Sequence, residues 1–337
     1  MINLMNDYNY TAHPRVIDAL REAAENRYVG YGLDEECFAA AGSIRGLIGL
    51  PDADVFFLPS GTITNLTALA AFLRPHEAVI APVSAHICMH ETGAVEATGH
   101  KVVTVVSDDG KARPEVVRRA VLAHTDEHMV KPRLLYISQT TELGTVYGRE
   151  EMRALRDVCD ECGLFLFIDG ARLGHALESP ACDFTLPEIA SFADIFYIGG
   201  TKNGLLFGEA LVICDPALTS EFRYLIKQRG GLMSKGFLLG IQFRAILEDG
   251  LYFELARHAN AMAALLSDKL AHAGVQLLAD TVSNQVFLFV DDGTLRRLQE
   301  HVLFEVWAAK SERGTPIRFV TTWKTTLEEI EAVMELL

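Results

Sequence analysis

The sequence carries too little positive charge for a protein that binds phosphate-rich polymers. Lysine and arginine together number 30, against 45 aspartates and glutamates, which gives a formal net charge of −15. Affinity for nucleic acids depends on lysine and arginine displacing counterions from the phosphate backbone. We therefore expect no nucleic-acid partner.

Long apolar runs are missing, and cysteines are few. No stretch approaches the roughly 20 apolar residues of a membrane-spanning helix, and the start MINLMNDYNY lacks the basic-then-apolar order of a signal peptide. We expect a cytoplasmic protein without membrane association. The six cysteines have no framework spacing, which indicates reduced thiols. Cys159 and Cys162 form a CxxC within a helical pattern, but no second CxxC completes a zinc site, so we expect no metal.

What the sequence does contain is a regular alternation of apolar strands and helical segments. Its 337 residues, 50% of them hydrophobic and 22% charged, suffice for a large domain with a smaller companion. Continuous apolar strands are typical of a sheet that helices cover on both faces. The sequence therefore predicts an α/β fold with a mainly parallel seven-stranded sheet, formed by residues 55–58, 78–81, 101–106, 133–138, 164–169, 194–199 and 209–214.

The pattern changes after Pro216. Long helical segments follow, and then come QVFLFV, IRFVTT and a terminal helix from Thr326. Fewer strands and longer helices indicate a smaller α+β domain. We place the boundary near Asp249 and Gly250, which gives a large domain at residues 1–249, including an N-terminal arm at 1–15, and a small C-terminal domain at 250–337.

The first candidate for chemistry is a turn of small residues. In FFLPSGTITNL a strand leads through Ser60, Gly61 and Thr62 into a helix. The free backbone N–H groups and the dipole at a helix start attract an anion such as phosphate. The same residues would also serve as an ordinary helix cap.

Two later strands end in residues whose side chains suit binding or catalysis. Asp169 lies where open α/β sheets bind ligands, and its charge there needs a cation, either a protonated pyridine nitrogen or Arg172. Thr201 and Lys202 follow another strand between glycines. A partly desolvated lysine is a good nucleophile toward carbonyl cofactors, although Lys-Asn-Gly also forms surface turns. A phosphate turn, an aspartate and a lysine about 33 residues later match the layout of a pyridoxal phosphate (PLP) site.

Several motifs extend this pattern along the chain. PSGTxxN, SAHxxxHETGA, IDGAR and TKNG occur in this order, with NDY near the start, YGxD at 31–34 and PIRFVTTW near the end. In these motifs the chain resembles the threonine aldolase and β-eliminating lyase family of fold-type-I PLP enzymes, above all the low-specificity L-threonine aldolases and phenylserine aldolase. The resemblance covers nearly the whole chain. It implies a PLP-dependent transferase-like fold, PLP as cofactor, and a homotetramer, built as a dimer of dimers, with shared active sites.

The resemblance also implies roles for individual residues. Lys202 would hold PLP as a Schiff base, Asp169 would keep the pyridine nitrogen protonated, and His86 would stack on the ring. Further cofactor contacts are implied for Ser60, Gly61, Thr62, Arg172, Thr201 and Lys235, the last from a neighbouring subunit unless it is a solvated surface charge. Substrate contacts are implied for Asn6, Arg172, Arg318 and Tyr31, the last from the partner subunit.

The activity that the resemblance implies is the cleavage of a β-hydroxy-α-amino acid, such as threonine, allo-threonine or phenylserine, to glycine and an aldehyde. Threonine aldolases often have a histidine after the fourth strand, facing the substrate hydroxyl, whereas this chain reads SQTTELG with Glu142 there. The hydroxyl base is thus either His86 or Glu142. The alternatives are β-elimination or transamination on another amino acid, and an inert PLP-fold protein, against which the retained Lys202 and Asp169 argue.

Overall fold

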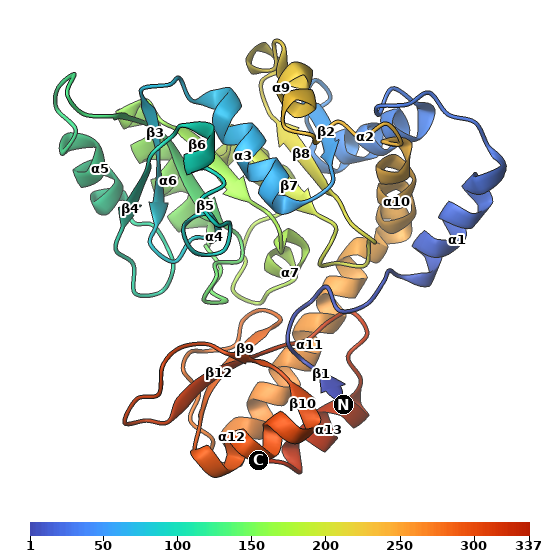
Figure 1. Ribbon diagram of the computed structural model, residues 1–337, viewed down its shortest axis with the longest axis vertical. Coiled ribbons are helices and arrows are strands. Elements are labelled where there is room, and N and C mark those ends of the chain that lie inside the picture. The colour runs from blue at the N-terminus through green and yellow to red at the C-terminus, as the bar shows by residue number, and fades with distance from the viewer.

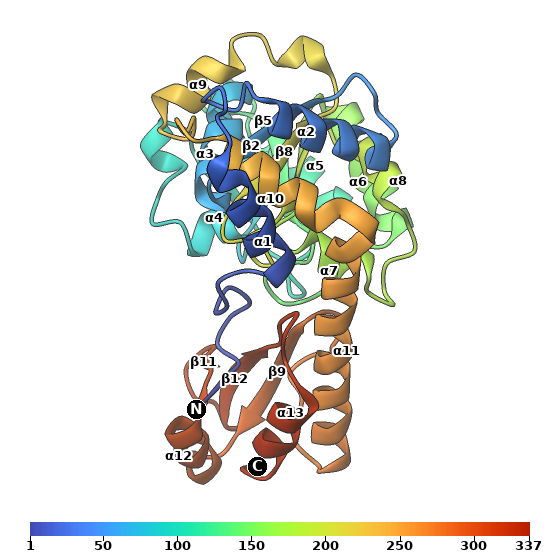
Figure 2. The same ribbon diagram turned by 90° about the vertical axis from the view of Figure 1, so that its right-hand side faces the viewer.

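The computed structural model describes residues 1–337, which form two lobes joined by one long helix (Figures 1 and 2). We call the part with the seven-stranded sheet the large lobe and the part with strands β9 to β12 the small lobe. None of the helices combines the length and apolar composition that crossing a membrane would require. All six cysteines are free thiols.

The large lobe is built on a mainly parallel sheet, as predicted. The strand order is β2-β8-β7-β6-β5-β3-β4. Only the two pairings made by β8 are antiparallel, and all seven predicted strands are confirmed. The strands are β2 (Asp54–Leu58), β3 (Glu77–Pro82), β4 (Val102–Val105), β5 (Lys131–Ser138), β6 (Phe165–Asp169), β7 (Ile195–Gly199) and β8 (Glu209–Ile213).

Helices cover both faces of this sheet, which is why its central strands are apolar on both sides. Successive strand residues point to opposite faces. Leu166, Ile168 and Phe196 accordingly belong to one core and Phe167, Ile195 and Tyr197 to another. The helices of this lobe are α1 (Pro14–Glu22), α2 (Glu35–Ile48), α3 (Gly61–Phe72), α4 (His86–Met89), α5 (Pro114–Leu122), α6 (Arg149–Cys162), α7 (Leu173–Leu177), α8 (Leu186–Phe192), α9 (Phe222–Gln228) and α10 (Phe237–Leu247).

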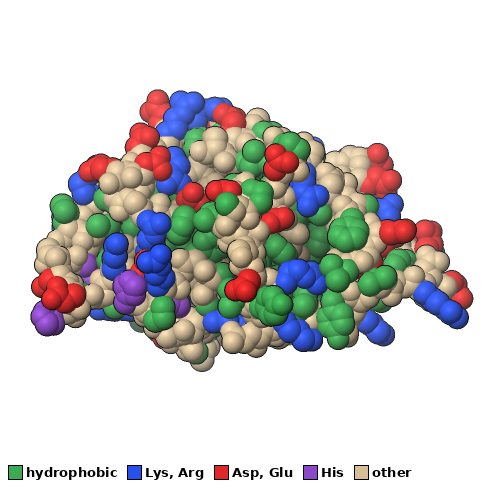
Figure 3. All heavy atoms as spheres, turned by 90° about the horizontal axis from the view of Figure 1, so that it is seen from above, with side chains coloured by type: hydrophobic (Ala, Val, Ile, Leu, Met, Phe, Trp, Pro, Cys, Tyr) green, Lys and Arg blue, Asp and Glu red, His purple; other side chains and the backbone are tan.

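Two antiparallel pairings of β8 have a consequence for the site. Because β8 runs against both β7 and β2, β2 runs in the same direction as β7. The carboxyl ends of β2, β5, β6 and β7 therefore lie at one edge of the sheet. Seen from above, the surface has acidic and basic side chains interspersed with hydrophobic ones. The negative net charge is therefore not concentrated on this face (Figure 3).

The small lobe has its own sheet and core. Strand β12 lies between β11 and β9 and is antiparallel to both. Leu266, Leu288 and Ile317 are among the residues that fill the core between this sheet and its helices. The elements are α11 (Leu251–His272), β9 (Gln285–Val290), α12 (Asp292–His301), β10 (Val302–Leu303), β11 (Glu305–Val306), β12 (Thr315–Val320) and α13 (Leu327–Met334).

The two lobes are connected at a kink and again through the N-terminus. Asp249 and Gly250 have positive φ angles of 55° and 74°, and α11 begins directly after them and continues into the small lobe. Strand β1 (Ile2–Asn3) pairs in parallel with β10. The first residues thus lie on the small lobe, although the sequence analysis grouped residues 1–15 with the large domain. Both chain ends lie on the small lobe (Figure 1).

Candidate active site

Asp169 is the centre of a hydrogen-bond network at the sheet edge. It ends β6 and is 3% exposed. Its Oδ1 accepts hydrogen bonds from the Tyr197 hydroxyl at 2.5 Å and the Ala171 backbone N–H at 2.9 Å. Its Oδ2 accepts from the Tyr136 hydroxyl and from the side-chain amide of Asn65 at 3.1 Å.

This network keeps Asp169 ionised although it is buried. Burial opposes the charged form, but the positive charge of His86 and the hydrogen bonds from Tyr136 and Tyr197 outweigh it, so the pKa of Asp169 is lowered. All four donors are neutral groups. The carboxylate therefore keeps a full negative charge at the bottom of the site, with no side-chain cation bonded to it.

Arg172, the other partner considered for Asp169, is bound elsewhere. Its Nε donates to Oδ2 of Asp7 at 2.6 Å and its Nη2 to Oδ1 at 3.1 Å, and Asn284 donates to Asp7 Oδ2 at 2.9 Å. Burial opposes ionisation of Asp7, but the Arg172 guanidinium holds its pKa well below the usual range. A salt bridge between Asp169 and Arg172 is thus excluded, and the Arg172 fork is occupied by Asp7.

A second buried carboxylate, Glu91, orients the histidine of the site. His86 is the first residue of α4, and its Nδ1 lies 2.8 Å from Oε1 of Glu91. Asn65 donates to the same oxygen at 2.7 Å, so one amide group bridges Glu91 and Asp169. Burial lowers the pKa of His86, but the hydrogen bond to Glu91 and the charges of Glu142 and Asp169 raise it overall. The site thus favours a protonated His86.

Lys202 is the one cation of the site without a polar partner. It lies in the turn between β7 and β8, is partly buried, and forms neither a hydrogen bond nor an ion pair. Burial and the nearby positive charge of Arg172 lower its pKa, and the charges of Asp7, Glu142 and Asp169 oppose this only in part. A lowered pKa increases the fraction of the neutral, nucleophilic amine.

The small-residue turn lies at the same edge. Ser60 caps α3, with its side chain accepting from the Ile63 N–H, so the cap reading is correct. The first N–H groups of a helix have no partner within the helix, and those of Gly61 and Thr62 are in this position. A Cβ atom on Gly61 would lie 3.4 Å from the Tyr197 hydroxyl, which places the turn beside the Asp169 network. The turn therefore both caps α3 and faces the site.

A comparison with known protein families shows which family the chain belongs to. The family model described as "Beta-eliminating lyase" matches residues 9–293. The chain belongs to the β-eliminating lyase family. The predicted resemblance and the fold-type-I α/β fold are confirmed, and the members of this family use PLP.

Individual members of the family are similar over nearly the whole chain. The low specificity L-threonine aldolase of Pseudomonas sp. (strain NCIMB 10558) is 34% identical over 93% of this chain and 90% of its own length. That of Pseudomonas aeruginosa is 33% identical over 94% and 91%. The structure of Leishmania major threonine aldolase has a TM-score of 0.98 and 45% identity, covering 100% of this chain and 98% of that one. An aspartate aminotransferase of Thermus thermophilus, at 17% identity and a TM-score of 0.75, shares the fold.

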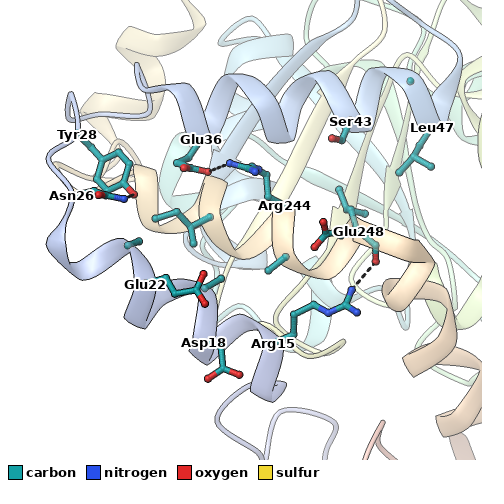
Figure 4. Close-up of a pocket in the computed structure, with 16 residues that line it drawn as sticks. Arg15, Asp18, Glu22, Asn26, Tyr28, Glu36, Ser43, Leu47, Arg244 and Glu248 are labelled. Atoms are coloured by element: carbon teal, nitrogen blue, oxygen red, sulfur yellow. Dashed lines mark hydrogen bonds and ion pairs between the residues drawn. The ribbon is translucent and has the colours of Figure 1, made fainter.

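The site residues of this β-eliminating lyase family member fit PLP. An ionised, buried carboxylate is what a protonated pyridine nitrogen requires, a lysine with no partner is what an aldehyde requires, and free N–H groups at a helix start suit a phosphate. Asp169, Lys202 and the turn Ser60 to Thr62 supply these three groups at one sheet edge. A cavity of about 1040 Å³ lies elsewhere, between α1, α2 and α10, and none of these residues lines it (Figure 4).

The residues proposed to meet the substrate differ in their surroundings. Glu142 is 8% exposed and has one weak contact, 3.5 Å from the Ser138 hydroxyl. Arg318 donates to Gln285 at 2.8 Å and to Glu305, while its buried Nε has no partner. Burial and the charge of Arg172 lower the pKa of Arg318, and the charge of Glu142 acts on it in the opposite direction.

Within a single subunit, four of the predicted site residues have no contact with the hydrogen-bond network around Asp169. The Asn6 side chain accepts from the Tyr8 N–H at 3.2 Å. Tyr31 and Lys235 are exposed on adjoining segments, where the Tyr31 N–H donates to the Ser234 carbonyl at 3.1 Å. The Thr201 hydroxyl is occupied by Glu209 and by the Gly208 N–H. Their roles toward cofactor and substrate stay predictions.

The sequence analysis also missed residues that the structure brings to the site. Asn65, Glu91 and Asp7 stand inside the motifs PSGTxxN, SAHxxxHETGA and NDY, so the motifs were the signal that could have found them. Tyr136 and Tyr197 had no such signal because each occurs in an apolar strand.

Proposed function

We propose that this protein is a PLP-dependent aldolase that cleaves a β-hydroxy-α-amino acid of the threonine type to glycine and an aldehyde. The observation that carries the proposal is the meeting of Lys202, Asp169 and Glu142 at one sheet edge, in a chain 45% identical to a threonine aldolase. When bound, PLP supplies a sink for the electron pair of the broken Cα–Cβ bond.

Lys202 would provide the amine that holds the cofactor, and its lowered pKa supports this role. Asp169 would keep its negative charge against the pyridine nitrogen, since neutral donors from Tyr136 and Tyr197 stabilise the carboxylate without neutralising it. His86 would lie over the ring, held at Nδ1 by Glu91. The backbone N–H groups of the small-residue turn would bind the phosphate.

The substrate carboxylate would be bound by Arg318 together with Arg172. Arg172 donates its Nε and Nη2 to Asp7. Arg318 donates its Nη1 to Gln285 and its Nη2 to Glu305, while its buried Nε has no partner. A guanidinium offers several N–H donors in one plane, which suits a carboxylate. Arg172 would also support the site by fixing Asp7 and by adding positive charge, and Asn6, next to Asp7, would assist.

Glu142 is the better candidate for the hydroxyl base. The Nδ1 of His86 is already engaged by Oε1 of Glu91 at 2.8 Å, which suits His86 to lying over the ring. Glu142 is a buried carboxylate with a single weak hydrogen bond, so its oxygens are free to accept a proton. Removing the hydroxyl proton lets the Cα–Cβ bond break, the aldehyde leaves, and a proton returned to Cα gives glycine.

A substrate panel tests this function. The purified holoenzyme is incubated with L-threonine, L-allo-threonine and L-phenylserine, and glycine and aldehyde are measured. Cleavage of at least one substrate is expected. Ammonia with a keto acid, or amino transfer to a keto acid, with no glycine formed, would instead assign β-elimination or transamination.

The role of Glu142 has its own test. We expect Glu142→Gln to lower kcat by about 100-fold or more, the usual contribution of a general base, with PLP occupancy unchanged. Glu77→Gln is the matched control, because Glu77 is also buried but lies at the amino end of β3, away from the site. Equal losses of kcat and cofactor occupancy in Glu142→Gln would contradict the role.

We also infer a homo-oligomer with shared active sites, of which a tetramer made of two dimers is the expected form. The exposed positions of Tyr31 and Lys235, without contact to the site of their own chain, support this. Sedimentation would measure the assembly. Mixing inactive Lys202→Ala with inactive Tyr31→Ala chains should restore activity only if sites are shared.

A further inference from the structure

The turn that carries Lys202 is closed by its own backbone. Strands β7 and β8 are antiparallel, with Gly199 paired to Glu209, and residues 200–208 connect them. The Gly200 N–H donates to the Gly208 carbonyl at 3.1 Å. A Cβ atom on Gly200 would lie 2.4 Å from a methyl carbon of Leu205 and 2.7 Å from the Gly208 oxygen. The turn is therefore tightly packed, and only glycine fits at its start.

Glu209 closes the turn from inside. Its Oε2 accepts from the Gly200 N–H at 2.9 Å and its Oε1 accepts from the Thr201 hydroxyl at 2.8 Å. The Thr201 oxygen in turn accepts from the Gly208 N–H at 2.9 Å. One carboxylate thus holds the two residues immediately before Lys202 and connects them to the far side of the turn.

Burying the Glu209 carboxyl group costs more folding free energy than a purely structural position would require. It is 4% exposed and forms no ion pair, and a buried carboxylate without a bonded cation is strongly disfavoured. Burial raises its pKa to about 7, while the hydrogen bonds from Thr201 and Gly200 and the charge of Lys202 oppose the rise. The other titratable groups that act on it or feel its charge are Asp169, Tyr197 and Tyr252.

We propose that Glu209 is the positioning residue of Lys202: its carboxyl group fixes the Gly200 to Gly208 turn so that the lysine side chain is held toward the edge where Asp169 lies. The inference deepens the proposed function by adding a residue to the same site, and it rests on that function only for the role of Lys202. Glu209 touches neither cofactor nor substrate. It acts through Gly200 and Thr201.

The test measures PLP binding by the full-length chain. Affinity is obtained by titration from the visible absorption of bound PLP, and attachment to Lys202 by borohydride reduction and mass spectrometry. Glu209→Ala should weaken PLP affinity by about tenfold or more, the effect expected from two lost hydrogen bonds. Glu77→Ala is the matched control, since Glu77 is a buried carboxylate at the first position of another strand. Its affinity should stay within about twofold of the wild type, because it has no contact with the site.

Rescue by glutamine distinguishes positioning from mere stability. At pH 6 the wild-type carboxyl is largely protonated because its pKa is about 7, so Glu209→Gln should bind PLP within about threefold of wild type, as expected for a neutral replacement of similar shape. At pH 8 the wild-type carboxylate is ionised and accepts both hydrogen bonds more strongly. The glutamine variant should then fall further behind.

Two outcomes would overturn the inference. One is a Glu209→Ala protein that binds PLP as tightly as Glu77→Ala. The other, which applies even if the alanine variant does not fold, is a ratio of wild-type to Glu209→Gln affinity that is the same at pH 6 and pH 8. Neither measurement uses threonine cleavage, so failure of the aldolase proposal would leave this test intact.

Discussion

Replacing Asp7 by asparagine should destabilise the protein out of proportion to the size of the change. Asp7 accepts three hydrogen bonds, two from Arg172 and one from Asn284, and the side chains of Asp7 and Arg172 are 0% and 6% exposed. The amide would turn one acceptor into a donor and leave a buried guanidinium without its counterion. Removing one partner of a buried pair costs about 3–5 kcal/mol.

The measurement is a double-variant cycle followed by denaturant unfolding of the full chain. Asp7→Asn, Arg172→Met and the combined variant are compared with wild type. Because Arg172→Met removes the buried cation itself, the combined variant should be less damaged than the sum of the single ones, with a coupling of about 3 kcal/mol. Additive losses, or a cost of Asp7→Asn below about 1 kcal/mol, would refute the reasoning.

The Asp7–Arg172 pair should also make the stability of the protein depend on pH. The pKa of Asp7 is lower in the folded than in the unfolded protein, so its stabilising contribution is present above the ordinary aspartate pKa of about 3.9 and is lost as the pH falls below it. Wild type should therefore lose stability more steeply than Asp7→Asn on acidification below about pH 4. Parallel acid curves would contradict the pair's role.

Three further predictions concern the network around Asp169. Tyr197→Phe removes a donor to Asp169, so the pKa of Asp169 should rise and PLP affinity should fall by about tenfold; titration checks this, and unchanged affinity would count against it. Glu91→Gln should lower the pKa of His86, moving its deprotonation to lower pH in an NMR titration; an unmoved pKa would show that Glu91 has no hold on the ring. Asn65→Leu deprives both carboxylates of a shared donor and should cost about 1–3 kcal/mol of unfolding free energy; a neutral effect would rule out the bridge.

The strands of the large sheet could be predicted from the sequence because each has a clear pattern. Both faces are covered, so each strand appears as a continuous apolar run, and the polar residue that ends it is conspicuous. Asp169 and Lys202 were found in this way. The same burial concealed Tyr136 and Tyr197, because alternation cannot separate two apolar faces, and a tyrosine whose hydroxyl reaches a carboxylate has the same pattern as one that only fills the core.

The partner of Arg172 could not be predicted for a different reason. Asp7 and Arg172 are 165 positions apart, and Asn284 comes from the other end of the chain. No local period or spacing connects them. Because Asp169 and Arg172 are close in sequence, an ion pair between them was a plausible prediction. The backbone turn after β6 instead directs the arginine toward the N-terminal segment.

The attachment of the N-terminal segment has a consequence for how the protein is made. Strand β1 pairs with Val302 and Leu303, and Asp7 is held by Asn284. During synthesis Asp7 leaves the ribosome long before Asn284 and strand β10, which hold the segment around it. The large sheet can form early, while Arg172 must wait for its counterion to be held in place. The surroundings of the Asp7–Arg172 pair are therefore completed late, and a nascent chain truncated before Asn284 would have the Lys202 turn but would lack one of the three donors to Asp7.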